Sequence, residues 1–471
     1  MGRKFYITCA IPYVNAKPHV GHALEFVQGD VIARYHKLLG EDVILLSGGD
    51  ENALKNVQAA EKANEPIQEF VDKNNKLFVE LTKNLNCEFD IWQKGSDKEK
   101  HFKSSQKLWE LCKDDIYQKE YEGLYCVGCE AFYSPEDLNE NGECFEHPGK
   151  KLESVKEKNY FFKLSKYQKD LIDLISKDKL KIYPIERKNE VLSFLKEPLQ
   201  DISISRSNER AKNWGVPVPN DDSQKIYVWF DALNIYQSGI GFGWDEEKYR
   251  KYWPADLHII GKGITRFHAV YWPAFLLSAG LKIPKALFVH GYFTVNGQKM
   301  SKTLGNVIDP NEIIEKYGAD ALRYYFLAKF QPFTDGDFSE SKLKDVYNAD
   351  LANGLGNLVS RVAKLCENSK FEFKLSSPEI YQQVSNSIKE FRFDNALKFI
   401  WEKITLVDKA VNKSEPWKLS GEILKETLQK YLCEIRTIAL NLKPFLPNTS
   451  EKILANIGSN RPISEVLFPR L

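Results

Sequence analysis

Residues 4–22 read KFYITCAIPYVNAKPHVGH and decide the fold of the first half of the chain. The first five of them form an apolar run that predicts a buried strand, and the loop that follows carries Pro12 and Pro18. His19-Val20-Gly21-His22 then opens an amphipathic segment that runs to about Gly40, so the motif lies at a helix N-terminus. Free backbone N–H groups and the positive end of the helix dipole make such a position an anion site. The two histidines, three residues apart on one helix face, therefore predict a phosphate-binding pair.

A second motif, Lys299-Met300-Ser301-Lys302-Thr303, lies between Gly297 and Gly305. Two lysines on a glycine-flanked segment can move over a pyrophosphate and neutralise the charge that develops in a transition state. Each motif is weak evidence by itself, because a His-x-Gly-His run is more often an ordinary helix start and Lys-x-x-Lys an ordinary solvated face. Together and in this order they predict nucleotide activation.

Alternating apolar runs and helical periods predict an α/β protein with a Rossmann-like, doubly wound parallel sheet. Strands are expected at residues 4–8, 42–47, 225–230, 257–260 and 286–293, with helices at 19–39 and 267–279. After residue 345 apolar residues recur only at helical spacing, which predicts an all-α bundle. We expect a catalytic domain of residues 1–116 and 223–294, interrupted by a connective domain of residues 117–222. A linker subdomain of residues 295–344 then carries the second motif, and an α-helical domain of residues 345–471 follows.

The composition excludes several classes of protein. The 471 residues include 66 Lys and Arg against 65 Asp and Glu, so there is no general basic coat, and any contact with RNA must be local. No apolar run approaches the ~20 residues of a membrane span, and the first residues lack a targeting pattern, which predicts a cytoplasmic protein. The eight cysteines are too few for a disulfide framework in so long a chain.

Three cysteines and a histidine form two pairs of chelating spacing within the expected insertion. Cys126 and Cys129 make the first pair and Cys144 and His147 the second, with Gly142 at the turn before the second pair. The alternative is a chance cluster of thiols with a surface histidine. Because all four positions of a tetrahedral ion would be filled by protein ligands, we expect a structural Zn²⁺ knuckle that helps a loop-rich segment to fold.

The two motifs together resemble the class-defining motifs of class I aminoacyl-tRNA synthetases, usually written HIGH and KMSKS. Further stretches are similar to those of the methionyl-tRNA synthetase family, and the similarity runs from the first strand to the terminal bundle. These stretches are Cys9-Ala10-Ile11-Pro12-Tyr13, Tyr227-Val228-Trp229-Phe230-Asp231-Ala232, and Ile260-Gly261-Lys262-Gly263-Ile264 followed by Phe267-His268 and Trp272.

The resemblance implies roles for individual residues in the catalytic half. His19, His22, Lys299 and Lys302 would be catalytic, and His19, Gly21, His22, Gly261, Lys299, Ser301 and Lys302 would bind ATP. Ile11, Tyr13, Trp229, Ala232, Leu233, Tyr236, Ile264, His268 and Trp272 would surround the methionine side chain, and Asp50 would hold its ammonium group. Aromatic rings suit a polarizable thioether and a carboxylate suits an ammonium. Core packing remains an equal alternative for Ile264 and Leu233.

The terminal bundle resembles the anticodon-reading domain of the same family. The matching positions are Asn353, Asn357, Arg361, Pro416 and Trp417. Unpaired anticodon bases stack on aromatic planes and expose their Watson–Crick edges, so Trp417 is expected to be a stacking platform and Asn357 and Arg361 edge readers. The alternatives are a helix-surface amide for Asn357 and a partly buried packing residue for Trp417. Because no appended module follows Leu471, we expect a monomer.

The expected insertion separates this chain from other class I families. Isoleucyl, leucyl and valyl relatives carry a much larger editing insertion. In cysteinyl relatives a thiolate of the catalytic core binds zinc at the substrate site, whereas the cysteine pairs here lie in the insertion.

Three positions depart from the methionyl pattern: Asn52 stands where a histidine is usual, Gly263 where an aspartate commonly helps to bind the ribose of ATP, and Thr303 where a serine is usual.

The resemblance implies a two-step ligation of L-methionine to tRNA(Met) through methionyl-adenylate, with Mg²⁺ bound largely through ATP oxygens. The departures leave a second hypothesis, a catalytically impaired paralogue that binds tRNA or methionine without activating it. A nucleotidyltransferase sharing only the first motif is a third possibility, but it would not need a helix bundle of this kind.

Overall fold

The computed structural model describes residues 2–126, 131–133, 138–144, 149–295, 297–300, 306–457 and 462–471. The chain forms two compact units. The first unit contains Met1–Pro18, Gly40–Glu80 and Phe89–His290, and the second contains His19–Leu39, Leu81–Glu88 and Gly291–Leu471. The helix that follows the first strand in sequence is therefore grouped with the C-terminal part of the chain.

The first unit is built on a six-stranded parallel sheet. In spatial order its strands are β3 (Ile91–Lys94), β2 (Asp42–Gly49), β1 (Lys4–Cys9), β12 (Leu257–Gly261), β13 (Ala286–His290) and β7 (Lys181–Tyr183). The central strands are buried on both faces, as their continuous apolar runs predict. The chain order runs outward from β1 to β3 on one side and from β12 to β13 on the other, where the earlier strand β7 forms the edge, so the switch point of the sheet lies between β1 and β12. The expected α/β Rossmann-like fold class is thus confirmed.

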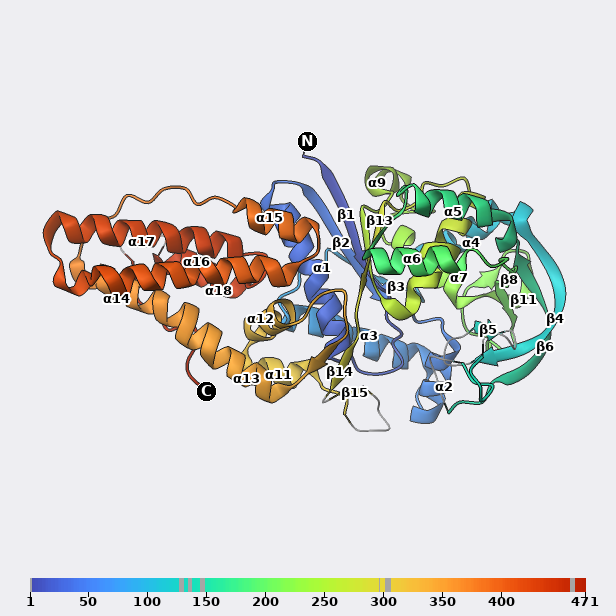
Figure 1. Cartoon of the computed structure of the whole chain (residues 1–471). Helices are drawn as coiled ribbons and strands as arrows, with labels where there is room; N and C mark the ends of the chain where they lie inside the picture. Colours follow the sequence, from blue (N-terminus) through green and yellow to red (C-terminus); the bar gives the residue numbers. More distant parts are fainter. Residues whose placement is uncertain are drawn as a thin grey trace. The chain divides into compact units, whose positions relative to one another are not determined.

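The segment expected to form the insertion is mainly antiparallel. Figure 1 shows β4 (Ile116–Cys126) and β6 (Glu153–Phe162) as a long hairpin, which pairs from Ile116 and Phe162 to Tyr125 and Glu153. Smaller strands complete two further sheets: β5 (Ala131–Tyr133), β8 (Ile202–Ser203), β9 (Ser205–Ser207), β10 (Pro217–Val218) and β11 (Asp221–Ile226). The same segment also supplies β7 to the parallel sheet, so it is not separate from that sheet along its whole length.

Short helices surround these sheets within the first unit. They are α2 (Leu54–Ala63), α3 (Ile67–Asn84, whose last turn belongs to the second unit), α4 (Lys103–Leu111), α5 (Gln168–Ser176), α6 (Ile185–Phe194), α7 (Val228–Leu233), α8 (Ile235–Ser238), α9 (Glu246–Tyr252) and α10 (Trp272–Ser278). The prediction of a strand over residues 225–230 is wrong. Strand β11 ends at Ile226, and α7 begins at Val228. A short apolar run does not distinguish a buried strand from a buried helix. The strand expected at residues 286–293 divides into β13 and β14 (Phe293–Val295), which belong to different sheets.

The second unit is mostly helical. Its helices are α1 (Val20–Leu38), α11 (Pro310–Tyr317), α12 (Ala319–Lys329), α13 (Glu340–Val346), α14 (Asn357–Ser369), α15 (Gln382–Lys389), α16 (Phe393–Ser414), α17 (Gly421–Leu442) and α18 (Pro447–Ile457). A π-helix, Tyr347–Gly356, leads into α14, and β14 forms a small sheet with β15 (Gln298–Lys299) and β16 (Gly336–Phe338). In Figure 1, α14, α16 and α17 run side by side as the expected bundle. No strand occurs after β16 in the described residues, as expected.

A buried ion network joins α1 to the rest of the second unit. The carboxylate of Asp30 contacts Arg34 Nε at 2.8 Å and Arg323 Nη2 at 2.7 Å, and neither Asp30 nor Arg323 is exposed to solvent. Arg323 also donates to the carbonyls of Pro444 and Phe445 at 2.9 and 2.7 Å. Because removal of one partner would leave a buried charge uncompensated, this network fixes α1 against α12 and the turn before α18.

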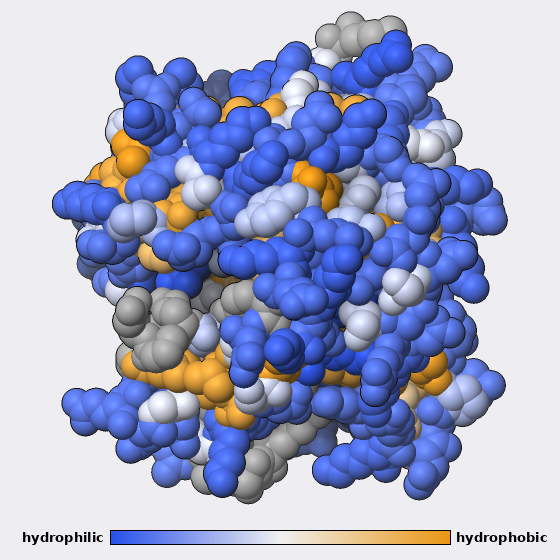
Figure 2. All heavy atoms as spheres, turned by 90° about the vertical axis from the view of Figure 1, so that its right-hand side faces the viewer, coloured by the Kyte–Doolittle hydropathy of each residue, from blue (hydrophilic) through white to orange (hydrophobic). Residues whose placement is uncertain are grey.

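The surface in Figure 2 is mainly hydrophilic, with hydrophobic residues gathered in patches between charged ones. Among the helices that the structure describes, none combines the length and the apolar character that crossing a bilayer requires.

Candidate active site

The first motif forms the N-terminal cap of α1. Nδ1 of His19 accepts a hydrogen bond from the backbone N–H of Gly21 at 3.1 Å, and Nδ1 of His22 accepts one from the backbone N–H of His19 at 3.2 Å. The two imidazole rings stack with centroids 3.9 Å apart. Because Nδ1 is the acceptor in both rings, a neutral ring carries its proton on Nε2, which is then the donor for a phosphate oxygen.

The electrostatic state of this pair follows from its surroundings. Burial lowers the pKa of His22 well below 6.5, and the neighbouring His19 lowers it further. His22 is therefore neutral near pH 7 and contributes a directed N–H rather than a positive charge. The charge of a triphosphate has to be neutralised by other groups, which is the role expected of the lysines in the second motif.

The second unit brings the two motifs close together. The backbone N–H of Val20 donates to the carbonyl of Ile308 at 3.3 Å, so the start of α1 is bonded to the chain just after the second motif. A Cβ atom added at Gly21 would lie 2.9 Å from Cε1 of His19 and 3.6 Å from Cε of Met300. Any side chain at position 21 would thus displace the capping histidine.

The lysines of the second motif are only partly described. The backbone of Lys299 pairs with Thr294 in the β14–β15 ladder. Ser301, Lys302 and Thr303 lie outside the described residues, so their roles stay predictions.

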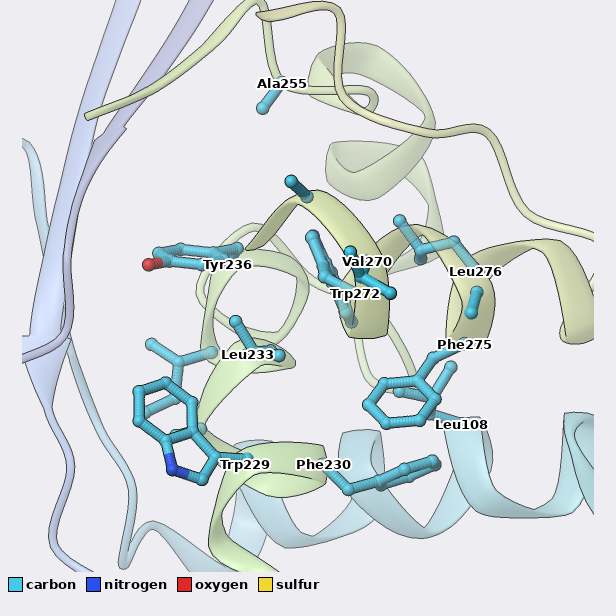
Figure 3. Close-up of a cluster of buried hydrophobic side chains, with 14 of the residues drawn as sticks. Leu108, Trp229, Phe230, Leu233, Tyr236, Ala255, Val270, Trp272, Phe275 and Leu276 are labelled. Carbon is cyan, nitrogen blue, oxygen red and sulfur yellow. The ribbon is translucent and has the colours of Figure 1, made fainter. Parts of the chain in front are cut away.

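Aromatic residues predicted to bind methionine meet in the first unit at the carboxyl ends of β1 and β12. The indole of Trp229 stacks on Phe267 with centroids 3.6 Å apart and planes 8° apart, and Tyr13 meets Trp229 edge-on at 6.3 Å. Phe267 is not among the expected pocket residues, although it stands next to His268 in the sequence. Figure 3 shows Trp229, Leu233 and Tyr236 on one side of a buried cluster, with Phe230 and Phe275 on the other.

Tyr236, His268 and the carbonyl of Ile264 form a chain of hydrogen bonds within the same unit. His268 donates from Nδ1 to the carbonyl of Ile264 at 2.9 Å, and its Nε2 accepts from the hydroxyl of Tyr236 at 2.8 Å. Burial lowers the pKa of His268 to about 4. Trp272 is fully buried, and its Nε1 has no hydrogen-bond partner among the described residues. A neutral histidine and an indole N–H beside aromatic rings provide a few polar groups in an apolar setting, which is typical of a small-molecule pocket.

The other residues predicted to surround the methionine side chain differ in how deeply they are buried. Ala232 and Leu233 are buried in α7, and Leu233 packs in the core, as its alternative interpretation allows. Ile11 and Ile264 are partly buried at the edge of the same hydrophobic cluster. All nine residues predicted to surround the methionine side chain thus lie in the first unit.

Asp50 lies directly after β2 and beside Tyr13. Its backbone N–H donates to the carbonyl of Pro12 at 2.9 Å, and residues 13 and 50 form an isolated parallel bridge. The amide of Asn56 donates to the carbonyl of Asp50 at 2.8 Å. The Asp50 residue is 4% exposed, so its position is held by backbone contacts on both sides. A carboxylate next to Tyr13 in a buried setting suits an ammonium group.

The chain offers a backbone turn rather than a carboxylate at the position expected to bind ribose. Gly261 ends β12 and caps a short 3₁₀ turn, Lys262–Ile264, that contains Gly263. A contact to ribose is therefore expected from backbone groups near Gly261 or from another part of the chain.

Acid sensitivity follows from the buried histidines. The folded-state pKa of His268, about 4, lies below the ordinary value of 6.5, so the unfolded chain takes up this proton first as the pH falls. The stability that depends on neutral His268 is therefore complete above about pH 6.5 and declines below it, by about 2 kcal/mol at pH 5. We expect thermal unfolding to show a falling Tm between pH 7 and pH 5, and a shallower fall in His268→Gln. An equal slope in both proteins would contradict this assignment.

Two of the four predicted metal ligands are described, and they converge. Sγ of Cys126 and Sγ of Cys144 lie 3.2 Å apart, and both residues are buried. This separation is longer than the ~2.05 Å of a disulfide. Cys129 and His147 lie outside the described residues, and the described residues contain no group of three potential ligands.

The predicted anticodon residues lie at one end of the helical bundle. Asn353 and Asn357 are exposed, four residues apart on the segment that leads into α14. Arg361 donates to Asp408 at 2.9 Å and to Asn412 at 2.7 Å, which connects α14 to the last turns of α16. These contacts orient the guanidinium while leaving the residue partly exposed.

The other two anticodon positions follow α16. Glu415 has a φ of 43° and ends the helix, and a 3₁₀ turn, Pro416–Lys418, comes next. Pro416 is buried, whereas Trp417 is 52% exposed. About half of the indole surface is therefore accessible to a base, and the stacking role stays a prediction.

A parallel sheet with aromatic and acidic groups at its switch point, a histidine-capped helix after its first strand and a C-terminal helix bundle together define a class I aminoacyl-tRNA synthetase. The family model described as tRNA synthetases class I (M) matches residues 5–363. The chain belongs to the methionyl-tRNA synthetase family, which confirms the resemblance found in the sequence.

Individual relatives cover nearly the whole chain. It is 40% identical to the methionine–tRNA ligase of Thermotoga maritima over 98% of this chain and 77% of that protein. The corresponding ligase of Brucella suis is 39% identical over 98% of this chain and 94% of its own length. Among solved structures, Mycobacterium tuberculosis methionyl-tRNA synthetase in complex with methionyl-adenylate matches with a TM-score of 0.90 and 34% identity, over 99% of both chains.

Proposed function

We propose that this chain joins L-methionine to tRNA(Met) in two steps and releases AMP and pyrophosphate. The observation that carries the proposal is the group of side chains that follows the central strands of the sheet, where the Trp229–Phe267 stack and the Tyr236–His268 pair lie in the same unit as Asp50, which pairs with Tyr13. Membership of the family supports the same conclusion.

In the first step an oxygen of the methionine carboxylate attacks the α-phosphorus of ATP. The bond from that phosphorus to the bridging oxygen of the β-phosphate breaks, and pyrophosphate leaves. His19 and the neutral His22 are proposed to donate from Nε2 to phosphate oxygens, and Lys299 and Lys302 to neutralise the departing pyrophosphate. Mg²⁺, bound mainly through ATP oxygens, supplies further charge. In the second step a terminal ribose hydroxyl of the tRNA attacks the carbonyl carbon, and AMP leaves.

The test is exchange of labelled pyrophosphate into ATP, with methionine, cysteine, leucine, isoleucine or valine as the added amino acid. Exchange with methionine alone is the expected result, and it needs no tRNA. Absence of exchange with every amino acid would reject the enzyme and favour the impaired paralogue.

We propose a structural Zn²⁺ ion held by Cys126, Cys129, Cys144 and His147. The observation that supports it is the approach of the two buried thiols, since two thiolates that each lie about 2.3 Å from one ion are necessarily neighbours. Zinc would give the loop-rich tip of the β4–β6 hairpin the cross-link that its small core lacks.

Elemental analysis of the purified protein should find about one zinc per chain. Cys126→Ser should lose the metal and lower Tm, because three remaining ligands bind more weakly. Cys433→Ser, which changes a half-buried cysteine of α17, is the matched control and should keep the metal. A wild-type chain purified without zinc, and unaffected by added zinc, would contradict the site.

Trp417 provides the test of anticodon stacking. Trp417→Ala should weaken tRNA binding about fivefold or more, because one base–aromatic stack contributes about 1–3 kcal/mol. The indole is 52% exposed, so Tm and methionine-dependent exchange should not change. Ile423→Ala removes another exposed apolar side chain from the bundle and serves as the control. Unchanged tRNA affinity in Trp417→Ala would reject the stacking role.

A further inference from the structure

A buried carboxylate that the mechanism does not use connects three separate segments of the first unit. Oδ1 of Asp231 accepts hydrogen bonds from Nε2 of His101 at 2.7 Å and from the hydroxyl of Ser105 at 2.8 Å. Oδ2 accepts a bond from the amide of Asn52 at 2.7 Å. Asp231 is 1% exposed and His101 is fully buried, so water cannot replace these contacts easily.

The orientation of the Asn52 amide is fixed by its two neighbours. Nδ2 donates to Oδ2 of Asp231 and also to the carbonyl of Gly95 at 2.8 Å, and both of these oxygens can only accept. The amide group therefore has to present its NH₂ to them. A Cβ atom at Gly95 would lie 3.0 Å from the carbonyl of Gly49 and 3.2 Å from the backbone nitrogen of Glu51, so Gly95 packs tightly against the backbone on either side of Asp50. Asn52 is one of the three departures from the family pattern, and here it acts as a neutral double donor.

The same pair spans the two halves of the methionine pocket. Asn52 stands two residues after Asp50, and Asp231 stands two residues after Trp229 in α7. The hydrogen bond between them is thus a side-chain link between the loop of the ammonium-binding carboxylate and the helix that carries the stacked indole. The neighbouring residue in the loop is also anchored, because Glu51 accepts from the backbone N–H of Ser96 at 2.8 Å.

We propose that Asn52 and Asp231 form a positioning pair that sets the distance between Asp50 and Trp229 and thereby the affinity for methionine. The inference rests on the proposed function, since it presumes that methionine binds between these two residues. The pair touches neither substrate, so its effect is on binding geometry and not on the reacting atoms. A shift of the Asp50 loop should weaken methionine binding and leave ATP binding unchanged.

The test is a charge exchange between the two positions. Asn52→Asp places a second carboxylate 2.7 Å from Asp231 and should raise KM for methionine about tenfold or more, with KM for ATP unchanged. The double variant Asn52→Asp with Asp231→Asn again places one amide against one carboxylate, while the carbonyl of Gly95 loses its donor. It should recover part of the lost methionine affinity, which equilibrium dialysis with labelled methionine measures independently of turnover.

A matched control separates positioning from a general loss of stability. Asp115 is another buried carboxylate of the first unit, and it accepts bonds from Lys166 at 2.6 Å and from Ser278 at 2.8 Å. Asp115→Asn should lower Tm without changing KM for methionine. If Asn52→Asp lowers only Tm, or if the double variant binds methionine no better than Asn52→Asp, the positioning role is wrong. Failure of the wild-type chain to exchange with methionine would instead reject the proposed function, and this inference with it.

Discussion

Asp50→Asn is expected to raise KM for methionine by about two orders of magnitude in pyrophosphate exchange. Asparagine keeps the shape of the side chain and removes its charge, so the ammonium group of methionine would lose a charge-assisted contact in a site that is 4% exposed. Loss of one partner from a desolvated charged pair costs about 2–5 kcal/mol. KM for ATP should stay within about twofold, because Asp50 is not among the residues proposed to bind ATP.

A substrate analogue without the amino group isolates this contact. 4-(Methylthio)butanoate has the side chain and carboxylate of methionine but no ammonium group, so it should inhibit the wild-type chain and Asp50→Asn about equally. Methionine should distinguish the two proteins strongly. If the analogue and methionine lose the same affinity in the variant, Asp50 acts on the shape of the pocket, and the proposed ammonium contact is wrong.

Lys302→Ala is expected to lower the rate of adenylate formation by about 10²–10³-fold, the loss that follows removal of one group aimed at developing charge. Methionine affinity should change little, because the lysine acts on pyrophosphate. The expectation gains weight from the neutrality of His22, since burial and His19 lower the pKa of that imidazole and leave the charge of the phosphates to the lysines. Single-turnover measurement of adenylate formation checks it.

Lys316→Ala is the control for this variant, because Lys316 is an exposed lysine of α11 that pairs with Glu340 at 3.1 Å. It should leave the rate unchanged. Equal losses of rate and of methionine affinity in Lys302→Ala would count against a transition-state role, since they would indicate removal of a contact made already in the ground state.

The sequence predicts most of the sheet because its central strands are continuous apolar runs. Residues 4–8, 42–47 and 257–260 fall within β1, β2 and β12. The edge strand β7 has only three residues, Lys181–Tyr183, and one apolar residue between two polar ones carries no recognisable period. Residues 226–230 are equally apolar, and only tertiary packing decides that Val228 begins a helix.

The predicted pocket residues could be proposed because they lie in short stretches that resemble a known family. The contacts between them could not be predicted in the same way. His101 and Asp231 are 130 residues apart, and neither has a neighbour in the sequence that signals the other. The stacking of Phe267 on Trp229 likewise depends on the crossing of two segments that follow different strands. The roles of the pocket, zinc and anticodon residues remain predictions until the experiments above are done.

The buried contact between Asp30 and Arg323 means that the chain cannot be divided where its motifs suggest. A fragment that stops at residue 344 would retain Arg323 but lose the carbonyls of Pro444 and Phe445, which accept hydrogen bonds from Nη2 and Nε of its guanidinium. The guanidinium that contacts Asp30 of α1 would then be left with Nε, one of its buried N–H donors, unpaired. Recombination between related genes would meet the same constraint, because an exchanged C-terminal helical half has to supply carbonyl acceptors at the positions of Pro444 and Phe445 for that guanidinium.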